Sequence, residues 1–91
     1  MNERYSRHPD LRLADVEGDG VVLHLGTRRY FSVSESGLIL LQALETPRSI
    51  DDLVRLLEEQ YEVTAEQAEA SVRQFLDTCR TADLLVIEGA T

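Results

Sequence analysis

The segment at residues 27–33, with the sequence TRRYFSV, constrains the fold of this chain more than any other feature. Side chains of a strand alternate between two faces, and the two predicted faces carry Arg29, Phe31, Val33 and Arg28, Tyr30, Ser32. The apolar pair of the first face is expected to point toward a core. The aromatic and basic side chains are better suited to binding a peptide than to catalysing a reaction. A helix start at residues 34–37 follows this strand directly.

Two more strands are predicted before this segment. Leu11 and Leu13 alternate with polar residues, and residues 21–25 are rich in β-branched and apolar side chains. Gly26 and Thr27 separate the second strand from the third, which predicts a two-residue type II′ turn with a positive φ at Gly26. Three consecutive antiparallel strands are therefore expected.

Three helices are predicted after the strands, over residues 34–45, 49–61 and 64–82. Ser34 is the expected N-cap of the first, and Ser49 and Thr64 open the other two with capping-box patterns. Gly37 lowers the helix propensity of the first turn, so we expect a close approach to the sheet there. The fold class is α+β: a winged helix-turn-helix with a three-stranded antiparallel sheet followed by three helices. Residues 84–87 fit either a final strand or a packed tail.

The 91 residues, 43% of them hydrophobic, suffice for one domain and one core but not for a deep cleft between two lobes. Residues 1–10 are polar, contain Pro9 and show no periodicity, so we expect a flexible N-terminal arm. The domain is expected to cover residues 11–88. These bounds favour recognition over catalysis, and the chain is predicted not to be an enzyme.

Charge and hydropathy narrow the expected partners. The formal net charge of −8 repels a nucleic-acid backbone. No apolar run approaches the roughly 20 residues needed to cross a bilayer, and the N-terminus is too polar for a signal peptide. We therefore expect a cytoplasmic protein with no membrane partner.

Cys79, His8 and His24 are the residues that invite a catalytic or metal-binding interpretation. Cys79 is the only cysteine and lies on the apolar stripe of the third predicted helix, so a buried, inert thiol is expected. The three residues lack the spacing of metal ligands. The sequence thus predicts neither a metal site nor a cofactor.

The order of these motifs makes the chain resemble the PqqD-like family, the precursor-peptide recognition elements of pathways that modify ribosomally made peptides. The resemblance runs from about Leu11 to Val86 and rests on the order and spacing of short motifs. These motifs contain Tyr30, Phe31, Val33, Ser34, Ser36, Gly37, Thr46, Pro47, Arg48, Ser49, Ile50, Tyr61, Glu62, Val63, Val72, Phe75, Leu76, Leu84 and Leu85. Asp83, Ser71 and Leu40 depart from the pattern, where the family often has Gly, Asp and Trp, so the subfamily is left open.

The resemblance implies non-enzymatic binding of a precursor's leader region as an added strand, in a groove between the third strand and the third helix. The peptide would be presented to a modifying enzyme such as a radical SAM maturase or a leader peptidase. Pyrroloquinoline quinone (PQQ) biosynthesis and lasso-peptide biosynthesis both fit a free-standing protein of this kind. The residues expected to bind the peptide are Arg28, Arg29, Tyr30, Phe31, Ser32, Val33, Val72, Phe75, Leu76 and Cys79.

Simpler interpretations stand beside these. The apolar residues of this set equally suit a core, and Arg28 and Arg29 equally suit solvated charges that protect a strand edge. A winged-helix DNA-binding regulator is an alternative function, although the second predicted helix carries four acidic residues against Arg55. A structural adaptor without a peptide groove is another. An exposed strand edge is also compatible with a homodimer.

Overall fold

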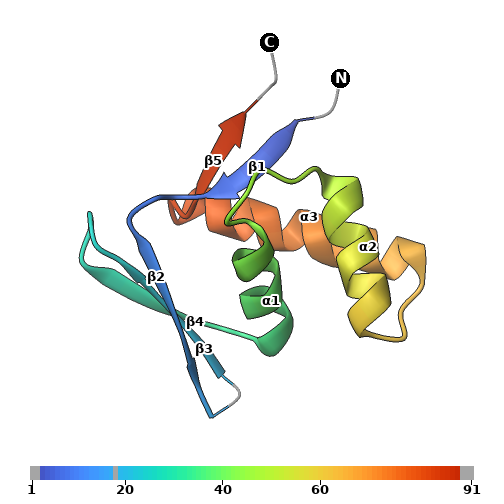
Figure 1. Ribbon diagram of the computed structural model, residues 1–91, viewed down its shortest axis with the longest axis horizontal. Coiled ribbons are helices and arrows are strands. Elements are labelled where there is room, and N and C mark those ends of the chain that lie inside the picture. Colours follow the sequence, from blue (N-terminus) through green and yellow to red (C-terminus); the bar gives the residue numbers. More distant parts are fainter. Residues whose placement is uncertain (1–2, 18, 89–91) are drawn as a thin grey trace.

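The computed structural model describes residues 3–17 and 19–88, which form two antiparallel sheets and three helices (Figure 1). The larger sheet has the order β2 (Leu11–Val16), β3 (Asp19–His24) and β4 (Arg29–Val33). The smaller sheet pairs β1 (Arg4–Arg7) with β5 (Leu85–Glu88). The helices are α1 (Glu35–Ala43), α2 (Ile50–Gln60) and α3 (Ala65–Thr81). The predicted α+β class, with a three-stranded sheet followed by three helices, is confirmed.

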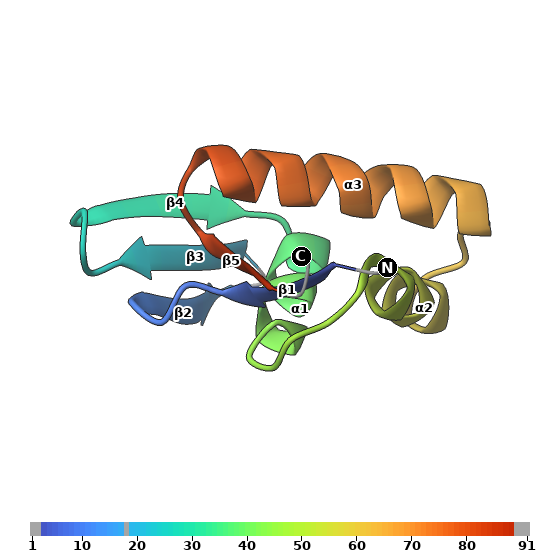
Figure 2. The ribbon, with the colours of Figure 1, turned by 90° about the horizontal axis from the view of Figure 1, so that it is seen from above.

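The core lies where α1 packs between the larger sheet and α2, and α3 runs past them on one side (Figure 2). Leu41, Leu44 and Leu53 have no exposed surface, and Val22 of β3 and Val72 of α3 are equally buried. Full burial of such a side chain contributes about 1.5–3 kcal/mol, so this contact between sheet and helices stabilises the domain. It also fixes where β4 and α3 lie.

The helices begin at the predicted N-caps. The Ser34 hydroxyl accepts a hydrogen bond from the Gly37 amide at 3.2 Å. Both predicted capping boxes are present, and in that of α2 the Ser49 amide donates to the Asp52 carboxylate at 3.0 Å. This hydrogen bond lowers the pKa of the Asp52 carboxyl from its ordinary value.

Gly37 allows the first turn of α1 to approach both its neighbours. A Cβ atom at this position would lie 3.1 Å from Cε1 of Phe75 in α3 and 3.3 Å from Cβ of Val33 in β4. The predicted close approach to the sheet is confirmed, and it extends to α3. A side chain here would push apart the elements that flank the candidate site.

The loop between β3 and β4 differs from the prediction. His24 pairs with Arg29, so the loop contains the four residues 25–28 instead of two. Arg28 takes the positive φ, at 62°, and its amide donates to the His24 carbonyl at 2.8 Å. The predicted type II′ turn is therefore wrong, because the His24 ring accepts hydrogen bonds from the loop amides of Gly26 and Thr27 and stabilises a wider loop. Arg28 consequently belongs to the loop and not to the strand.

Residues 4–7 form a paired strand where a flexible arm was expected. Tyr5 pairs with Ile87 of β5, and on its other side its amide and carbonyl form hydrogen bonds with Arg48 of 2.7 and 2.8 Å. The open question about residues 84–87 is thereby answered in favour of a strand. Met1 and Asn2 lie outside the described residues. The domain boundary at Leu11 remains a prediction, and no helix within the described residues is long and apolar enough to span a bilayer.

Candidate functional site: a groove between β4 and α3

A groove of about 360 Å³ lies between strand β4 and helix α3. The first turn of α1 closes it at one end of β4, through Ser36 and Gly37. The turn between α3 and β5 contributes Ala82 and Leu84. The larger sheet and all three helices therefore contribute residues to the lining of this groove.

Strand β4 forms one wall of the groove. Among the described residues it is an edge strand, hydrogen-bonded to β3 on one side only. Phe31 and Val33 are half-buried and face the core, while Ser32 is exposed, and all three residues line the groove. The free edge of such a strand presents unpaired N–H and C=O groups, which can pair with another extended chain.

Helix α3 forms the opposite wall. Its exposed polar side chains, Ser71, Gln74 and Thr78, lie beside the half-buried ring of Phe75 and the buried Cys79. Leu40 and Leu57 extend the apolar floor between the walls. An apolar floor with hydroxyl and amide groups at its rim suits an extended peptide, which offers apolar side chains and a polar backbone.

The structure divides the ten predicted site residues into three groups. Phe31, Ser32, Val33, Phe75 and Cys79 line the groove. Val72 and Leu76 are buried in the core, with 0% and 5% exposed. Arg28, Arg29 and Tyr30 are exposed and do not line it, and Tyr30 is 76% exposed. Contact of any of them with a peptide remains a prediction.

Sequence reasoning missed the polar wall of the groove. Ser71, Gln74 and Thr78 stand three or four residues apart in sequence and so share one face of α3. That face continues through Phe75 and Ala82, directly beside the apolar stripe. The signal was the helical spacing of small polar residues next to the buried stripe, and it was obscured by the weight given to hydrophobic positions.

Burial determines the chemistry of Cys79. The side chain is 2% exposed, and desolvation raises the pKa of its thiol to about 12. The thiol therefore stays protonated at neutral pH, where only the thiolate is an effective nucleophile. The expectation of a buried thiol is confirmed.

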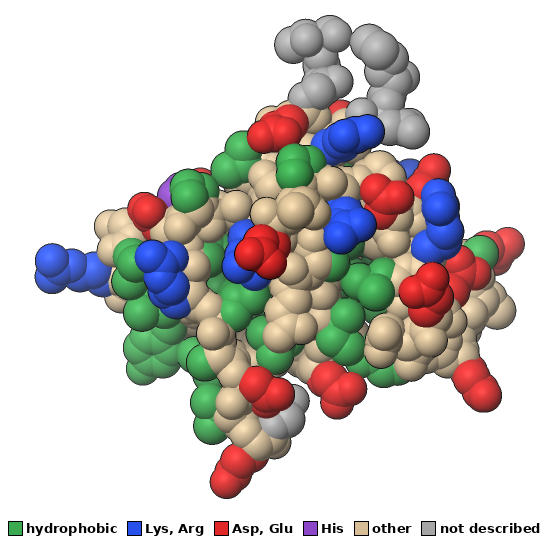
Figure 3. All heavy atoms as spheres, viewed as in Figure 1, with side chains coloured by type: hydrophobic (Ala, Val, Ile, Leu, Met, Phe, Trp, Pro, Cys, Tyr) green, Lys and Arg blue, Asp and Glu red, His purple; other side chains and the backbone are tan. Residues whose placement is uncertain are grey.

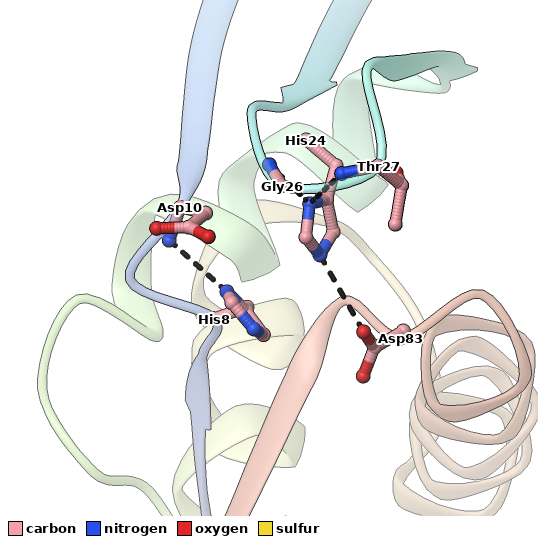
Figure 4. Close-up of polar contacts among 6 residues, drawn as sticks. All are labelled: His8, Asp10, His24, Gly26, Thr27 and Asp83. Carbon is pink, nitrogen blue, oxygen red and sulfur yellow. Dashed lines mark hydrogen bonds and ion pairs between the residues drawn. The ribbon is translucent and has the colours of Figure 1, made fainter.

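His8, His24 and Asp83, which sequence spacing did not connect, lie within 4.8 Å of one another through their ligand atoms (Figure 4). Each histidine uses Nδ1 as an acceptor, His8 from the Asp10 amide at 3.0 Å and His24 from the amides of its own loop. A neutral imidazole has one acceptor and one donor nitrogen, so Nε2 carries the proton in both rings. In this tautomer, Nε2 of His24 is a donor that faces the Asp83 carboxylate.

Both signs of charge are spread over the surface. Figure 3 shows basic side chains at one tip of the larger sheet and over the helices, interspersed with acidic side chains. Two ion pairs of α3 are local, joining Arg73 to Glu69 and Arg80 to Asp77 at 3.0 and 3.3 Å. Exposed pairs of this kind contribute little to stability.

Comparisons of the sequence and of the structure with known proteins point to the same kind of protein. A family model described as "Coenzyme PQQ synthesis protein D (PqqD)" matches residues 19–85. The solved structure "TbiB1 in Complex with the TbiA(beta) Leader Peptide" is 26% identical, with a TM-score of 0.78, and the match covers 94% of this chain and 98% of that chain. The structure "Lasso peptide synthetase B1 complexed with the leader peptide" is 18% identical, with a TM-score of 0.76, and the match covers 90% and 96% of the two chains. A search of curated proteins finds no match.

Proposed function

The chain belongs to the PqqD family, and on this basis we propose that it binds the leader region of a ribosomally made precursor peptide as an additional strand along β4. The observation that carries the proposal is the groove between the free edge of β4 and helix α3. The proteins named in the two similar structures were both solved with a leader peptide. The bound peptide would then be presented to a separate modifying enzyme.

Strand addition accounts for both affinity and selectivity. A peptide paired with β4 (Arg29–Val33) forms backbone hydrogen bonds that depend little on its sequence. Its side chains alternate, so every second one points toward the groove floor near Phe31 and Phe75. We infer that the leader carries apolar residues at these positions, because the floor is apolar.

The side chains that line the groove support a role without catalysis. Among the described lining residues there is no His, Asp, Glu or Lys that would transfer a proton. Serine and threonine hydroxyls need such a base to act as nucleophiles, and the raised pKa of Cys79 removes its thiolate. The groove therefore offers shape and hydrogen bonds.

The first test is a titration of isotopically labelled protein with synthetic leader peptides encoded beside its gene, followed through the amide resonances. We expect shifts concentrated in β4 (Arg29–Val33) and along the groove-facing side of α3 (Ala65–Thr81). A flat response to every such peptide would contradict the proposal and favour an adaptor without a peptide groove.

A pair of matched variants locates the binding surface. Thr78 lines the groove and Thr81 does not, although both are exposed and both lie on α3. We expect Thr78→Arg to fill the groove and weaken leader binding by at least about tenfold, equivalent to about 1.4 kcal/mol. Thr81→Arg should leave the dissociation constant within about twofold of the wild-type value, since the expected contacts are untouched. Equal effects of the two substitutions in calorimetry would place the peptide elsewhere.

We further propose that the protein acts in the cytoplasm with a partner enzyme, such as a radical SAM maturase or a leader peptidase. The free edge of β4 also suits a homodimer in which two copies pair through these strands. Because peptide and second copy would compete for one edge, added leader should convert such a dimer to monomer in sedimentation velocity. A dimer that persists with saturating leader would place the contact between copies on another surface.

A further inference from the structure

Within residues 3–17 and 19–88, His24 is the only buried polar side chain, with 2% of it exposed. Its Nδ1 accepts hydrogen bonds from the amides of Gly26 at 3.1 Å and Thr27 at 3.3 Å, which leaves the ring proton on Nε2. That proton has no hydrogen-bond partner among the described residues. Nε2 instead faces the Asp83 carboxylate, whose Oδ2 lies 3.6 Å away (Figure 4).

The His24–Asp83 pair spans the end of the groove. His24 ends β3 and pairs with Arg29, the first residue of the strand wall. Asp83 stands between Ala82 and Leu84, which both line the groove at the end of α3. The pair thus joins the strand wall to the helix wall without itself lining the groove.

The backbone of Asp83 is held in place, and its side chain is mostly exposed. Its φ is 61°, a left-handed conformation that Asp and Asn tolerate better than most residues, and its amide donates to the Arg80 carbonyl at 3.1 Å. Its side chain is 70% exposed. Asp83 therefore takes a backbone geometry that suits Gly and adds a carboxylate that faces a buried donor.

We propose that His24 and Asp83 are a positioning pair, in which the Nε2–H of His24 donates to Asp83 and holds the two groove walls at the spacing that the bound peptide requires. This inference rests on the proposed leader binding. The 3.6 Å separation exceeds the 2.7–3.2 Å of a good hydrogen bond, so a small approach of the α3–β5 turn toward the sheet completes it. Burial of an unpaired donor is unfavourable, which favours that approach.

The test measures affinity for the tightest-binding leader peptide encoded beside the gene, with the TbiA(beta) leader peptide as a second probe. Asp83→Gly suits the left-handed backbone and removes the acceptor, so it should retain its folding stability and weaken binding about fivefold. Asp83→Asn keeps an acceptor oxygen and should bind within about twofold of wild type. His24→Asn keeps an acceptor near Nδ1 and removes Nε2, so it should weaken binding as Asp83→Gly does.

A double-mutant cycle separates positioning from general damage. If the two residues act as a pair, combining His24→Asn with Asp83→Gly should weaken binding no more than His24→Asn alone. In imidazole nitrogen spectra, the Nε2–H signal of His24 should shift when leader is added to wild type and not when it is added to Asp83→Gly.

Four results would overturn the inference, and they are distinguishable. Unchanged affinity of Asp83→Gly, or additive effects in the cycle, would remove the pair while leaving leader binding intact. Failure of wild type to bind any leader would remove the proposed function and the pair with it. Loss of the Nε2–H signals of His8 and His24 on adding zinc ions would show the opposite tautomer and a metal site.

Discussion

Burial of a single side chain makes Cys79 a sensitive reporter of the groove. Because the pKa of its thiol is raised from 9.0 to about 12, the thiolate fraction at pH 7–8 is lower than that of a free cysteine by roughly a thousandfold. We expect iodoacetamide to modify the folded protein at least about a hundredfold more slowly than the urea-unfolded protein. Mass spectrometry of quenched samples measures both rates.

The pH dependence gives this experiment its control. A raised pKa means that the folded protein should remain unreactive through pH 9, where an ordinary cysteine is already half ionised. Leader peptide should slow the reaction further, since Cys79 lines the groove. Rapid modification of the folded protein at pH 8 would contradict the buried position.

Residue-level prediction succeeded where periodicity carried the information. The apolar stripe of the third predicted helix contains Val72, Leu76 and Cys79, and all three side chains are buried in the structure. The place of Arg28 could not be predicted in the same way, because it depends on a side chain four residues earlier. The His24 ring stabilises a four-residue loop through local hydrogen bonds, and no pattern of hydrophobic residues encodes such a contact.

At the scale of the element, the capping box of α2 should make the stability of the protein depend on pH. Ser49 caps the helix, and its amide lowers the pKa of Asp52 below 3.8 in the folded state. A lowered pKa contributes stability above the unfolded value, and that stability is lost as pH falls through the folded pKa. We expect Asp52→Ala, which removes the acceptor of the Ser49 amide, to lower the free energy of unfolding by about 1 kcal/mol at pH 7.

Urea unfolding across pH 2–7 tests this expectation. The difference between wild type and Asp52→Ala should shrink toward pH 2, where protonation of Asp52 weakens its hydrogen bond from the Ser49 amide in the wild type. Ser36→Ala serves as a control, since Ser36 lies in the first turn of α1 and is not the N-cap of that helix. A difference that stays constant with pH would show that Asp52 does not contribute through its charge.

Helix ends were predictable because each is specified by a few adjacent residues. Both capping boxes and the N-cap at Ser34 depend on hydrogen bonds between positions three apart. Strand β1 has no comparable local signal. Its partners, β5 and Arg48, are distant in sequence, and the polar residues of β1 do not alternate with apolar ones.

At the scale of the whole molecule, β1 and β5 close the fold away from the groove. Three amides of the N-terminal segment donate across the fold, from Tyr5 to Arg48, from Arg7 to Leu44 and from His8 to Leu84, at 2.7 to 2.9 Å. Tyr5 also packs against the core, and desolvation raises the pKa of its hydroxyl. The N-terminal segment thus connects α1, the α1–α2 loop and the end of α3.

Hydrogen exchange distinguishes this closure from the flexible arm that the sequence favoured. Amides in a flexible arm exchange at the rate of an unfolded chain, whereas hydrogen-bonded strand amides exchange only when the strand opens. We expect the Tyr5, Arg7 and His8 amides to be protected at least about tenfold, and the Glu3 amide to exchange freely as an internal control. Added leader should leave these rates unchanged, because β1 does not line the groove. Exchange of all three amides at unfolded rates would restore the domain boundary at Leu11 and reduce the folded unit to the larger sheet and the helices.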